Sequence, residues 1–392
     1  MISKGALSHI KVLDLTRVLA GPWAGQTLAD MGADVIKVEQ PGKGDDTRTW
    51  GPPFLKDEND EQTSESAYFL CANRGKRSIC LDLSSDQGQL ELRRLVSECD
   101  VLIENFKVGQ LRKFKLDYET LSSLNPRLVY CSITGFGQHG PYANRPGYDF
   151  MIQGMSGLMS VTGSPDGEPQ KVGVAVTDLL TGLYSVVGIL AALSERENSG
   201  LGQHVDLSLF DVSVAAMANQ ASNHLIGEVT PKAMGNAHPN IVPYQCFATS
   251  DGHCIVAVGN DAQFARFCEA IDLPELALNT HYRTNRVRVK NRKQLVELIS
   301  NVMQSKTSEQ WLSLLSDADV PAGPINTMAD VFRDPQVIMR EMKITMAHPH
   351  NRKINLVGSP LKFSRTPVVY HRAPPLLGQH TDEVISKNGG WN

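Results

Sequence analysis

The feature that most constrains the fold of this chain is a repeated alternation between short aliphatic segments and amphipathic segments. Residues 10–15 and 34–39 are rich in aliphatic side chains, as buried strands usually are. Between them, Trp23, Thr27 and Met31 fall on one face of a helix. Strands that alternate with amphipathic helices build a parallel sheet with helices on both faces. The sequence therefore predicts an α/β fold.

The same alternation continues over the first 226 residues. Ser85 and Asp86 are suitable helix-capping residues, and an apolar stripe at helical spacing follows them. Further strands are expected at residues 101–104, 127–134 and 204–208. Further helices are expected around residues 149–159, 179–194 and 210–226. We therefore expect one large domain in this part of the chain.

The character of the sequence changes near Gly227. Residues 244–249 and 254–258 are typical of strands and flank Asp251-Gly252, which is a strong signal for a β-hairpin. Helical patterns follow near residues 262–272, 291–304 and 308–317. We predict a large domain over residues 1–226, a smaller α+β domain over 227–325, and a return segment over 326–392 that completes the large domain.

Charge and hydropathy argue against two classes of partner. The formal net charge is −4 and the isoelectric point is near 6.3, whereas a nucleic-acid-binding protein usually has a basic excess. The most basic stretch, residues 283–293, is interpreted as a solvated face. The longest strongly apolar stretch, residues 183–193, is shorter than the roughly 20 residues that a membrane span needs. We therefore expect no nucleic-acid partner and no membrane partner.

The seven cysteines are scattered along the chain without a C-x-x-C pair. Zinc sites and redox pairs need closely spaced thiolates, so neither is expected, and isolated thiols are typical of a reducing compartment. The eleven histidines include no H-E-x-x-H motif. The first residues do not resemble a signal peptide. We predict a cytoplasmic protein without a metal site.

A glycine-rich segment follows the strand predicted at residues 127–134. Gly135-Phe-Gly-Gln-His-Gly140 matches G-x-G-x-x-G, a motif of dinucleotide-binding enzymes. In those enzymes a helix begins at the third glycine and its N-terminus meets the pyrophosphate, whereas here Pro141 follows and indicates a loop. A nicotinamide-dependent oxidoreductase stays an alternative, and the loop can still border a ligand.

Two further features allow two interpretations each. The basic cluster at residues 73–77 suits a ligand with phosphate groups, but it also suits a solvated turn. Asp178 follows residues 174–177 at the start of the long apolar helix. An aspartate in a first helical turn interacts favourably with the helix dipole, which is a structural role. The same position favours the ionised carboxylate that a nucleophile requires.

Taken in order, these motifs resemble the class III CoA-transferase family, also called the CaiB/BaiF type. The shared segments are VLDLTRVLAGP (12–22), GADVIKVE (32–39), GDDTR (44–48), NRGKRS (73–78), ENF (104–106), SITGFG (132–137), TDLLTG (177–182), VPAGP (320–324) and PLLGQHTD (375–382). Within the family, residues 41–54, 241–245 and 323–326 are most similar to members that use succinyl-CoA and glutarate. The resemblance implies transfer of CoA from an acyl-CoA such as succinyl-CoA to a free dicarboxylic acid.

The resemblance also implies roles for single residues. Asp178 matches the catalytic aspartate of the family, the nucleophile that carries aspartyl anhydride and aspartyl-CoA thioester intermediates. The expected CoA contacts, with one arginine from the basic cluster, are Arg17, Gln40, Arg74, Leu81, Asn105, Phe106, Lys113, Thr134 and Gly135. Gln40 and Lys113 replace arginines of some members. The candidate contacts of the acid substrate are Arg48, Tyr148, Gly235 and His238.

The family has a Rossmann-like large domain, a smaller inserted domain and a homodimer of interlocked chains, so the same is expected here. Acyl-CoA is expected as a substrate, without a permanently bound cofactor. The α-methylacyl-CoA racemases are an alternative, but they need a histidine where this chain has Tyr148, because racemisation requires two proton-transfer groups. A CoA-binding protein without catalysis is a further alternative.

Overall fold

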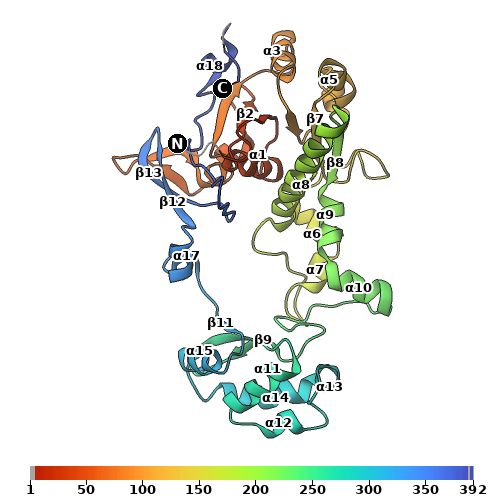
Figure 1. The fold of residues 1–392 in the computed structure, drawn as a ribbon, viewed down its shortest axis with the longest axis vertical. Helices are drawn as coiled ribbons and strands as arrows, with labels where there is room; N and C mark the ends of the chain where they lie inside the picture. Colours follow the sequence, from red (N-terminus) through yellow and green to blue (C-terminus); the bar gives the residue numbers. More distant parts are fainter. Residues whose placement is uncertain (1–4, 387–388, 392) are drawn as a thin grey trace. The chain divides into compact units, whose positions relative to one another are not determined.

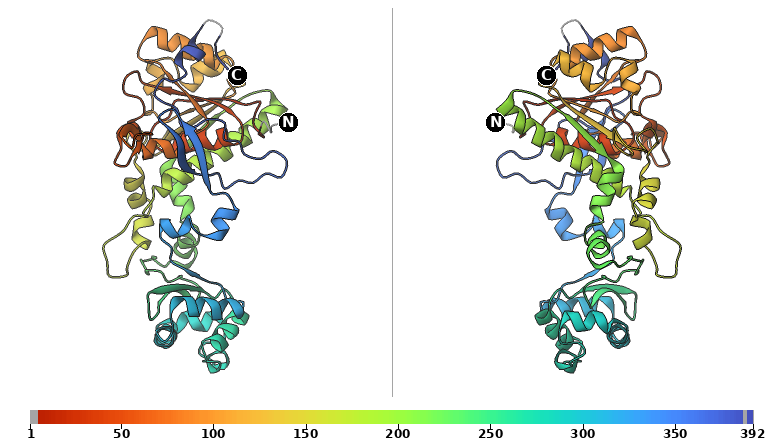
Figure 2. Two further views of the ribbon diagram at one scale, coloured as in Figure 1. Left: turned by 90° about the vertical axis from the view of Figure 1, so that its left-hand side faces the viewer. Right: turned by 90° about the vertical axis from the view of Figure 1, so that its right-hand side faces the viewer.

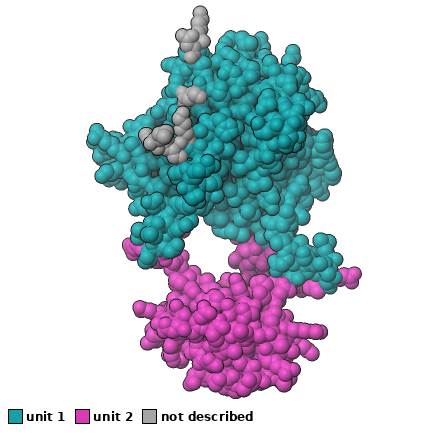
Figure 3. Space-filling model, in the orientation of Figure 1, with its two compact units in different colours: residues 1–158, 172–227, 335–392 teal, residues 159–171, 228–334 magenta. Residues whose placement is uncertain are grey.

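The computed structural model describes residues 5–386 and 389–391 of the chain. The residues group into two compact units (Figure 3). The first unit comprises the chain up to residue 158, residues 172–227 and the chain from residue 335 onward, and the second comprises residues 159–171 and 228–334. The predicted domain limits after residues 226 and 325 stay predictions. The two units differ from them chiefly because residues 159–171 belong to the second unit.

The first unit contains a six-stranded sheet in the order β5-β2-β1-β6-β7-β8, and every neighbouring pair is parallel (Figure 1). The strands are β1 (Lys11–Asp14), β2 (Asp34–Glu39), β5 (Lys76–Cys80), β6 (Val101–Glu104), β7 (Val129–Thr134) and β8 (His204–Ser208). The predicted α/β fold with a parallel sheet is confirmed. The chain runs outward from β1 to β5 and then returns to the other side of β1, so the strand order reverses between β1 and β6.

Helices cover both faces of this sheet because alternate strand residues point to opposite sides. The helices of the first unit are α1 (Ala20–Asp30), α2 (Ala67–Cys71), α3 (Asp86–Val96), α4 (Gln110–Lys113), α5 (Tyr118–Leu124), α6 (Asp149–Met155), α8 (Val176–Ser199), α9 (Leu209–Ala216), α10 (Ala218–Gly227), α17 (Pro335–Met339), α18 (Thr381–Ile385) and the 3-10 helix η1 (Asp46–Thr49). Helices α1 and α8 pack on the face that carries Val12 and Val101. Helices α3, α4 and α5 pack on the face that carries Leu13 and Leu102.

The longest helix, α8, lies across the sheet beside α1 (Figure 2, light green). Its composition and length would allow it to cross a membrane, but half of its most apolar window is buried inside the protein. It also buries polar side chains, among them Thr181 and Ser185, which bond to the carbonyl one turn earlier. Helix α8 is therefore a core helix of the first unit. It begins at Val176, before the predicted start, so that Asp178 lies in its first turn.

The C-terminal part of the chain packs on the first unit. The backbone N–H of Gly75 donates to the carbonyl of Arg372, and that of His380 donates to the carbonyl of Ser78, each at 2.9 Å. Two antiparallel hairpins complete the unit, formed by β3 (Phe54–Lys56) with β4 (Gln62–Ser66) and by β12 (Lys343–His348) with β13 (Asn351–Val357). These segments lie on the side of the sheet that ends at β5, away from β8 (Figure 1).

The second unit contains a three-stranded antiparallel sheet in the order β11-β10-β9. Its elements are β9 (Tyr244–Ala248), β10 (His253–Ala257), β11 (Ala322–Pro324), α11 (Asp261–Ala270), α12 (Glu275–Leu278), α13 (Asn285–Lys290), α14 (Arg292–Met303), α15 (Ser308–Asp317) and α16 (Met328–Val331), and α7 (Leu158–Val161) spans the limit between the units. The predicted hairpin at Asp251-Gly252 joins β9 to β10. The basic stretch is not wholly solvated as expected, because Arg288 is buried and bonds to Asp261 and the Val242 carbonyl.

Candidate active site

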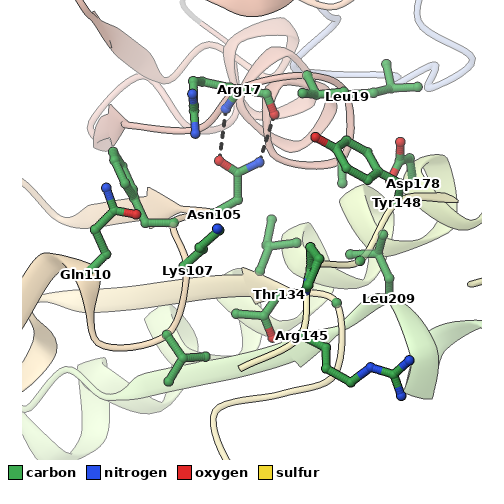
Figure 4. Close-up of a pocket in the computed structure, with 18 of the residues that line it drawn as sticks. Arg17, Leu19, Asn105, Lys107, Gln110, Thr134, Arg145, Tyr148, Asp178 and Leu209 are labelled. Carbon is green, nitrogen blue, oxygen red and sulfur yellow. Dashed lines mark hydrogen bonds between the residues drawn. The ribbon is translucent and has the colours of Figure 1, made fainter. Parts of the chain in front are cut away.

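A cavity of about 230 Å³ lies at the carboxyl ends of β1, β6 and β7, next to the point where the strand order reverses (Figure 4). Its lining residues all belong to the first unit. Most of the wall comes from residues 17–20 after β1, residues 105–108 after β6, and residues 133–135 at the end of β7. Residues 143–148 and Asp178 add a further side. Open α/β sheets commonly bind ligands in this position.

Asp178 contributes the carboxylate of this wall. It is the third residue of α8, and its side chain is 9% exposed. No hydrogen-bond partner for the carboxylate is found among the residues that the structure describes, although it lines the cavity. A carboxylate at the surface of a cavity without a protein partner is available to react with a ligand.

A second carboxylate holds the start of α8 from outside the helix. The capping residue Ala175 provides no side-chain hydrogen bond. Instead, Asp149 at the start of α6 accepts the N–H of Thr177 at 2.9 Å, which satisfies one of the helix's free amides. The other Asp149 oxygen accepts the amide of Gln153 at 2.7 Å, and Gln153 in turn accepts the N–H of Val172 at 2.9 Å. This chain fixes the backbone that carries Asp178.

The electrostatic setting of Asp178 differs from the expectation. A helix N-terminus alone favours the ionised form, as the sequence predicted. In the structure, burial and the negative charge of Asp149 raise the pKa of Asp178 to about 7. Loss of hydration and the neighbouring carboxylate thus oppose the effect of the helix N-terminus at this position. Burial and the charge of Asp178 also raise the pKa of Tyr68 to about 12, so a protonated phenol lies near the carboxylate.

The loops after β1 and β6 are clamped together at the opposite side of the cavity. The Arg17 N–H donates to the Asn105 side-chain oxygen at 3.0 Å, and the Asn105 amide donates to the Arg17 carbonyl at 2.8 Å (Figure 4). The Arg17 guanidinium pairs with Asp46 at 3.2 Å and lies 5.8 Å from the Phe106 ring centre. The structure thus brings together three residues predicted from two separate motifs.

Two cations of the cavity were not identified from the sequence. Lys107 follows the ENF motif directly, and Arg145 lies in the loop before α6. Both are exposed, and the described part of the chain offers neither an ion-pair partner. Together with Arg17 they give the cavity three cations, which suit phosphate groups. In the sequence, a role for Lys107 in this site was indicated only by its position next to Phe106.

The end of β7 meets the following loop at close range. A Cβ atom on Gly135 would lie 2.6 Å from the Cα of Gly147, and one on Gly147 would lie 2.3 Å from the Cα of Gly135. Only glycines allow this contact, which places Thr134 and the neighbouring Tyr148 in the cavity wall. No helix begins at Gly140, because the next helix is α6. The loop predicted here is confirmed, and the geometry of a dinucleotide motif is absent over this stretch.

Three expected CoA contacts other than Arg74 lie outside the cavity wall. Gln40 and Lys113 are exposed side chains, and Leu81 belongs to the core beneath the sheet. None of the three lines the cavity. The structure therefore places only part of the expected contact set in one site.

Arg48 and Arg74 are buried and paired within the protein. The Arg48 guanidinium donates to both oxygens of Glu39 at 2.8 Å and lies 3.6 Å from the Phe69 ring centre. The Arg74 guanidinium donates to both oxygens of Asp30, at 2.8 and 2.6 Å. Both arginines thus donate to carboxylates of the protein itself. The substrate contact expected at Arg48 and the CoA contact expected at Arg74 stay predictions.

Gly235 and His238 belong to the second unit. Gly235 has a positive φ of 60° and donates its N–H to the Gly163 carbonyl at 2.9 Å. The His238 carbonyl accepts a hydrogen bond from Arg292 at 2.7 Å. Burial and the charge of Arg292 lower the pKa of His238, so the imidazole is neutral near pH 7. Their role toward the acid substrate stays a prediction.

The comparisons with known proteins agree with one another. Residues 7–381 match CoA-transferase family III. The chain is 50% identical to the succinate–glutarate CoA-transferase of Agrobacterium fabrum, over 98% of this chain and 96% of that protein. It is 45% identical to the human succinyl-CoA:glutarate CoA-transferase, over 97% and 85% respectively. The crystal structure of a CaiB/BaiF family protein from Brucella suis is 51% identical and gives a TM-score of 0.84 over 96% of this chain and 97% of that one. The chain therefore belongs to CoA-transferase family III and is a CoA-transferase.

Proposed function

We propose that this enzyme moves CoA from succinyl-CoA to a free dicarboxylic acid such as glutarate, with Asp178 as the nucleophile. The observation that carries the proposal is the unpaired Asp178 carboxylate in a cavity that also holds three cations. Two relatives at 45–50% identity are named for succinate or succinyl-CoA and glutarate. Acyl-CoA is a substrate in this proposal and not a resident cofactor.

The cavity suggests how acyl-CoA binds. The diphosphate and 3′-phosphate of CoA face Arg17, Lys107 and Arg145, since these cations border the cavity. The pantetheine arm passes between Phe106 and the Thr134–Gly135 corner, and the thioester reaches Asp178. Water has to be excluded around the carboxylate, because an acyl anhydride hydrolyses readily. Gly235 and His238 are proposed to belong to the segment that covers the intermediate.

The proposed reaction passes through four acyl transfers. The Asp178 carboxylate attacks the succinyl thioester carbon and expels CoA thiolate, which leaves a mixed anhydride. The thiolate attacks the aspartyl carbon, releases succinate and forms an aspartyl-CoA thioester. The acceptor carboxylate displaces the thiolate again and forms a second anhydride. The thiolate then attacks the new acyl carbon, which yields the product acyl-CoA and restores Asp178. One thioester is consumed and one is formed, so the exchange needs no other energy source.

The raised pKa of Asp178 fits this role in a specific way. A carboxylate is a weak nucleophile, and its reactivity rises with its basicity. A pKa of about 7 gives Asp178 more basicity than an exposed aspartate while leaving a large ionised fraction at neutral pH. Positioning by the Asp149–Gln153 chain adds the orientation that such a nucleophile requires.

We also propose that the enzyme is a homodimer of interlocked chains in the cytoplasm. The family resemblance implies this assembly, and one face of α8 supports it. Leu183, Tyr184 and Val187 are 45%, 48% and 62% exposed in the single chain. A contiguous apolar face on a core helix usually meets another protein surface.

An exchange assay followed by mass spectrometry tests the proposed function. The protein is mixed with succinyl-CoA and a panel of free acids that includes glutarate, other dicarboxylates, oxalate, formate and carnitine. We expect new acyl-CoA masses with dicarboxylates and none with the Asp178→Ala protein. Substantial transfer by that variant would contradict Asp178 as nucleophile. Exchange confined to monocarboxylates would contradict the substrate class, and deuterium entry at the α-carbon of a 2-methylacyl-CoA would favour a racemase.

A further inference from the structure

A second cavity, of about 290 Å³, shares Lys107 and Val108 with the cavity of Asp178. Polar side chains from three adjacent strands meet in its lining: Glu104 of β6, Ser132 of β7 and His204 of β8. Glu104 and Ser132 face each other in the parallel register and are buried. The reaction proposed above uses none of these three groups.

Ser132 lies between the other two side chains, since β7 lies between β6 and β8. Ser132 Oγ lies 2.8 Å from His204 Nε2, and Ser132, opposite Glu104 on the neighbouring strand, lowers the pKa of the Glu104 carboxyl as a hydrogen-bonding group. The His204 ring is stacked on Tyr118, with ring centres 5.1 Å apart, which holds its orientation.

Glu104 also bonds to the wall of the first cavity. A Glu104 oxygen accepts the backbone N–H of Phe106 at 2.8 Å. The two residues after Glu104 are Asn105, which clamps Arg17, and Phe106, which lies under the Arg17 guanidinium. The position of Glu104 therefore determines the conformation of the turn that contains Asn105, Phe106 and Lys107.

We propose that Glu104, held by Ser132 and His204, is a positioning residue that shapes the CoA-binding wall through the Phe106 amide. This inference rests on the proposed assignment of the Asp178 cavity to acyl-CoA. It assigns the second cavity no ligand. Glu104 touches no substrate, so its effect falls on the affinity for CoA and not on the acyl transfers.

The charge state of Glu104 gives the proposal a pH signature. Burial raises the pKa of Glu104 to about 7, although the Ser132 and Phe106 hydrogen bonds oppose the rise. The ionised form present above that pH is the stronger acceptor for the Phe106 N–H. CoA affinity should therefore decline as pH falls through this range. The other titratable groups around Glu104, beside His204, are Lys107, Arg112, Asp117, Tyr118, Glu119, Tyr130, His139 and Asp206.

The test compares CoA dissociation constants and succinyl-CoA KM values among single variants. Glu104→Ala should raise both by about 10-fold, since a charge-assisted hydrogen bond is lost, while kcat stays within about 3-fold. Ser132→Ala should raise them less, by about 3-fold. Glu119→Gln removes a carboxylate of the same cavity whose partner is the exposed Arg112, and it should match the wild type. Asn105→Ala serves as the positive control for the cavity wall.

A pH series of CoA binding adds a readout that a merely structural role would not move. It is measured in the Asp178→Asn background, so that Asp178 does not titrate. The loss of affinity below about pH 7 should be smaller when Glu104→Gln is added. CoA phosphates titrate equally in both proteins and cancel in the comparison.

The outcomes separate the two proposals. If Asn105→Ala weakens CoA binding while both Glu104→Ala and Ser132→Ala bind like the wild type, the positioning role is wrong and the cavity assignment stands. If Asn105→Ala has no effect either, the cavity assignment itself is wrong. Unchanged pH dependence with Glu104→Gln would also overturn the inference. Melting temperatures identify a variant that fails to fold, and Ser132→Ala, which deletes one oxygen, keeps the test available in that case.

Discussion

Two regions of the first unit hold charged side chains in opposite ways. In the cavity, Asp178, Lys107 and Arg145 have no ion-pair partner among the described residues. Around the neighbouring strands β1, β2 and β5, a buried ion-pair layer contains charged side chains that each have a partner of opposite sign. Its pairs are Asp14–Lys76 at 2.8 Å, Lys37–Asp45 at 2.9 Å, Glu39–Arg48 at 2.8 Å and Asp30–Arg74 at 2.6 Å.

The difference shows how the same residue types serve binding in one place and architecture in another. A buried charge is costly unless a partner of opposite sign and further hydrogen bonds satisfy it. The ion-pair layer meets that condition, so its charges are balanced without a ligand. The cavity leaves the cations Lys107 and Arg145 unmatched, and an anionic acyl-CoA can then supply the missing partner.

The largest effect is expected when the Asp178 carboxylate of the cavity is removed. Asp178→Asn keeps the size of the side chain but removes the nucleophile, so the transfer rate should fall by roughly 10⁴-fold or more. The unfolding free energy should change little, since Asp178 has no hydrogen-bond partner among the described residues. The rate is measured with succinyl-CoA and glutarate, and folding is measured by urea denaturation. Retained activity, or a large loss of stability, would place Asp178 with the structural charges.

The next largest effect is expected when one ion pair of the buried layer is disrupted. Arg74→Met leaves Asp30 buried without its partner, which should cost about 3 kcal/mol of unfolding free energy. The folded variant should bind CoA as the wild type does. Asp30→Asn combined with Arg74→Met should recover part of the loss. A variant that is stable but binds CoA weakly would support Arg74 as a CoA contact.

A smaller effect tests the unmatched cations. Lys107→Ala and Arg145→Ala should each raise the dissociation constant of CoA by about 5-fold at low ionic strength, and by less at high salt, because exposed charges are screened. Their unfolding free energies should stay within about 0.5 kcal/mol of the wild type. Equal binding at both salt concentrations would show that the phosphates lie elsewhere.

The comparison also explains what the sequence could predict. The alternation of strands and helices predicts a parallel sheet, and the carboxyl ends of such strands meet at one edge. For that reason the motifs after β1, β6 and β7 supplied Arg17, Asn105 and Thr134 to one cavity. Asp178 joined them because a helix N-terminus points to the same edge. Local patterns sufficed wherever the fold itself brings the ends of elements together.

Local patterns failed where a partner lies far along the chain. Arg74 meets Asp30 across 44 residues, and Arg48 meets Glu39 across nine. Their motifs contain no sign of these carboxylates, so a buried arginine and a phosphate-binding arginine look alike in sequence. The cap of α8 has the same origin, since Asp149 lies 28 residues before Thr177. Tertiary pairing, unlike helix or strand periodicity, leaves no regular spacing to detect.

The smallest effect is expected at Asp149, whose carboxylate has both a structural and an electrostatic role. Asp149 is a structural acceptor for Thr177, yet its charge also helps to raise the pKa of Asp178. Asp149→Asn keeps an oxygen that can accept the N–H but removes the charge, so the pKa of Asp178 should fall. Because the ionised carboxylate is the nucleophile, kcat declines when pH drops through that pKa, and in the variant this decline should occur at lower pH. Profiles of kcat with saturating substrates between about pH 5.5 and 8.5 measure the shift. Coincident profiles would mean that Asp149 acts on Asp178 through the helix cap alone, which would assign Asp149 to the structural group.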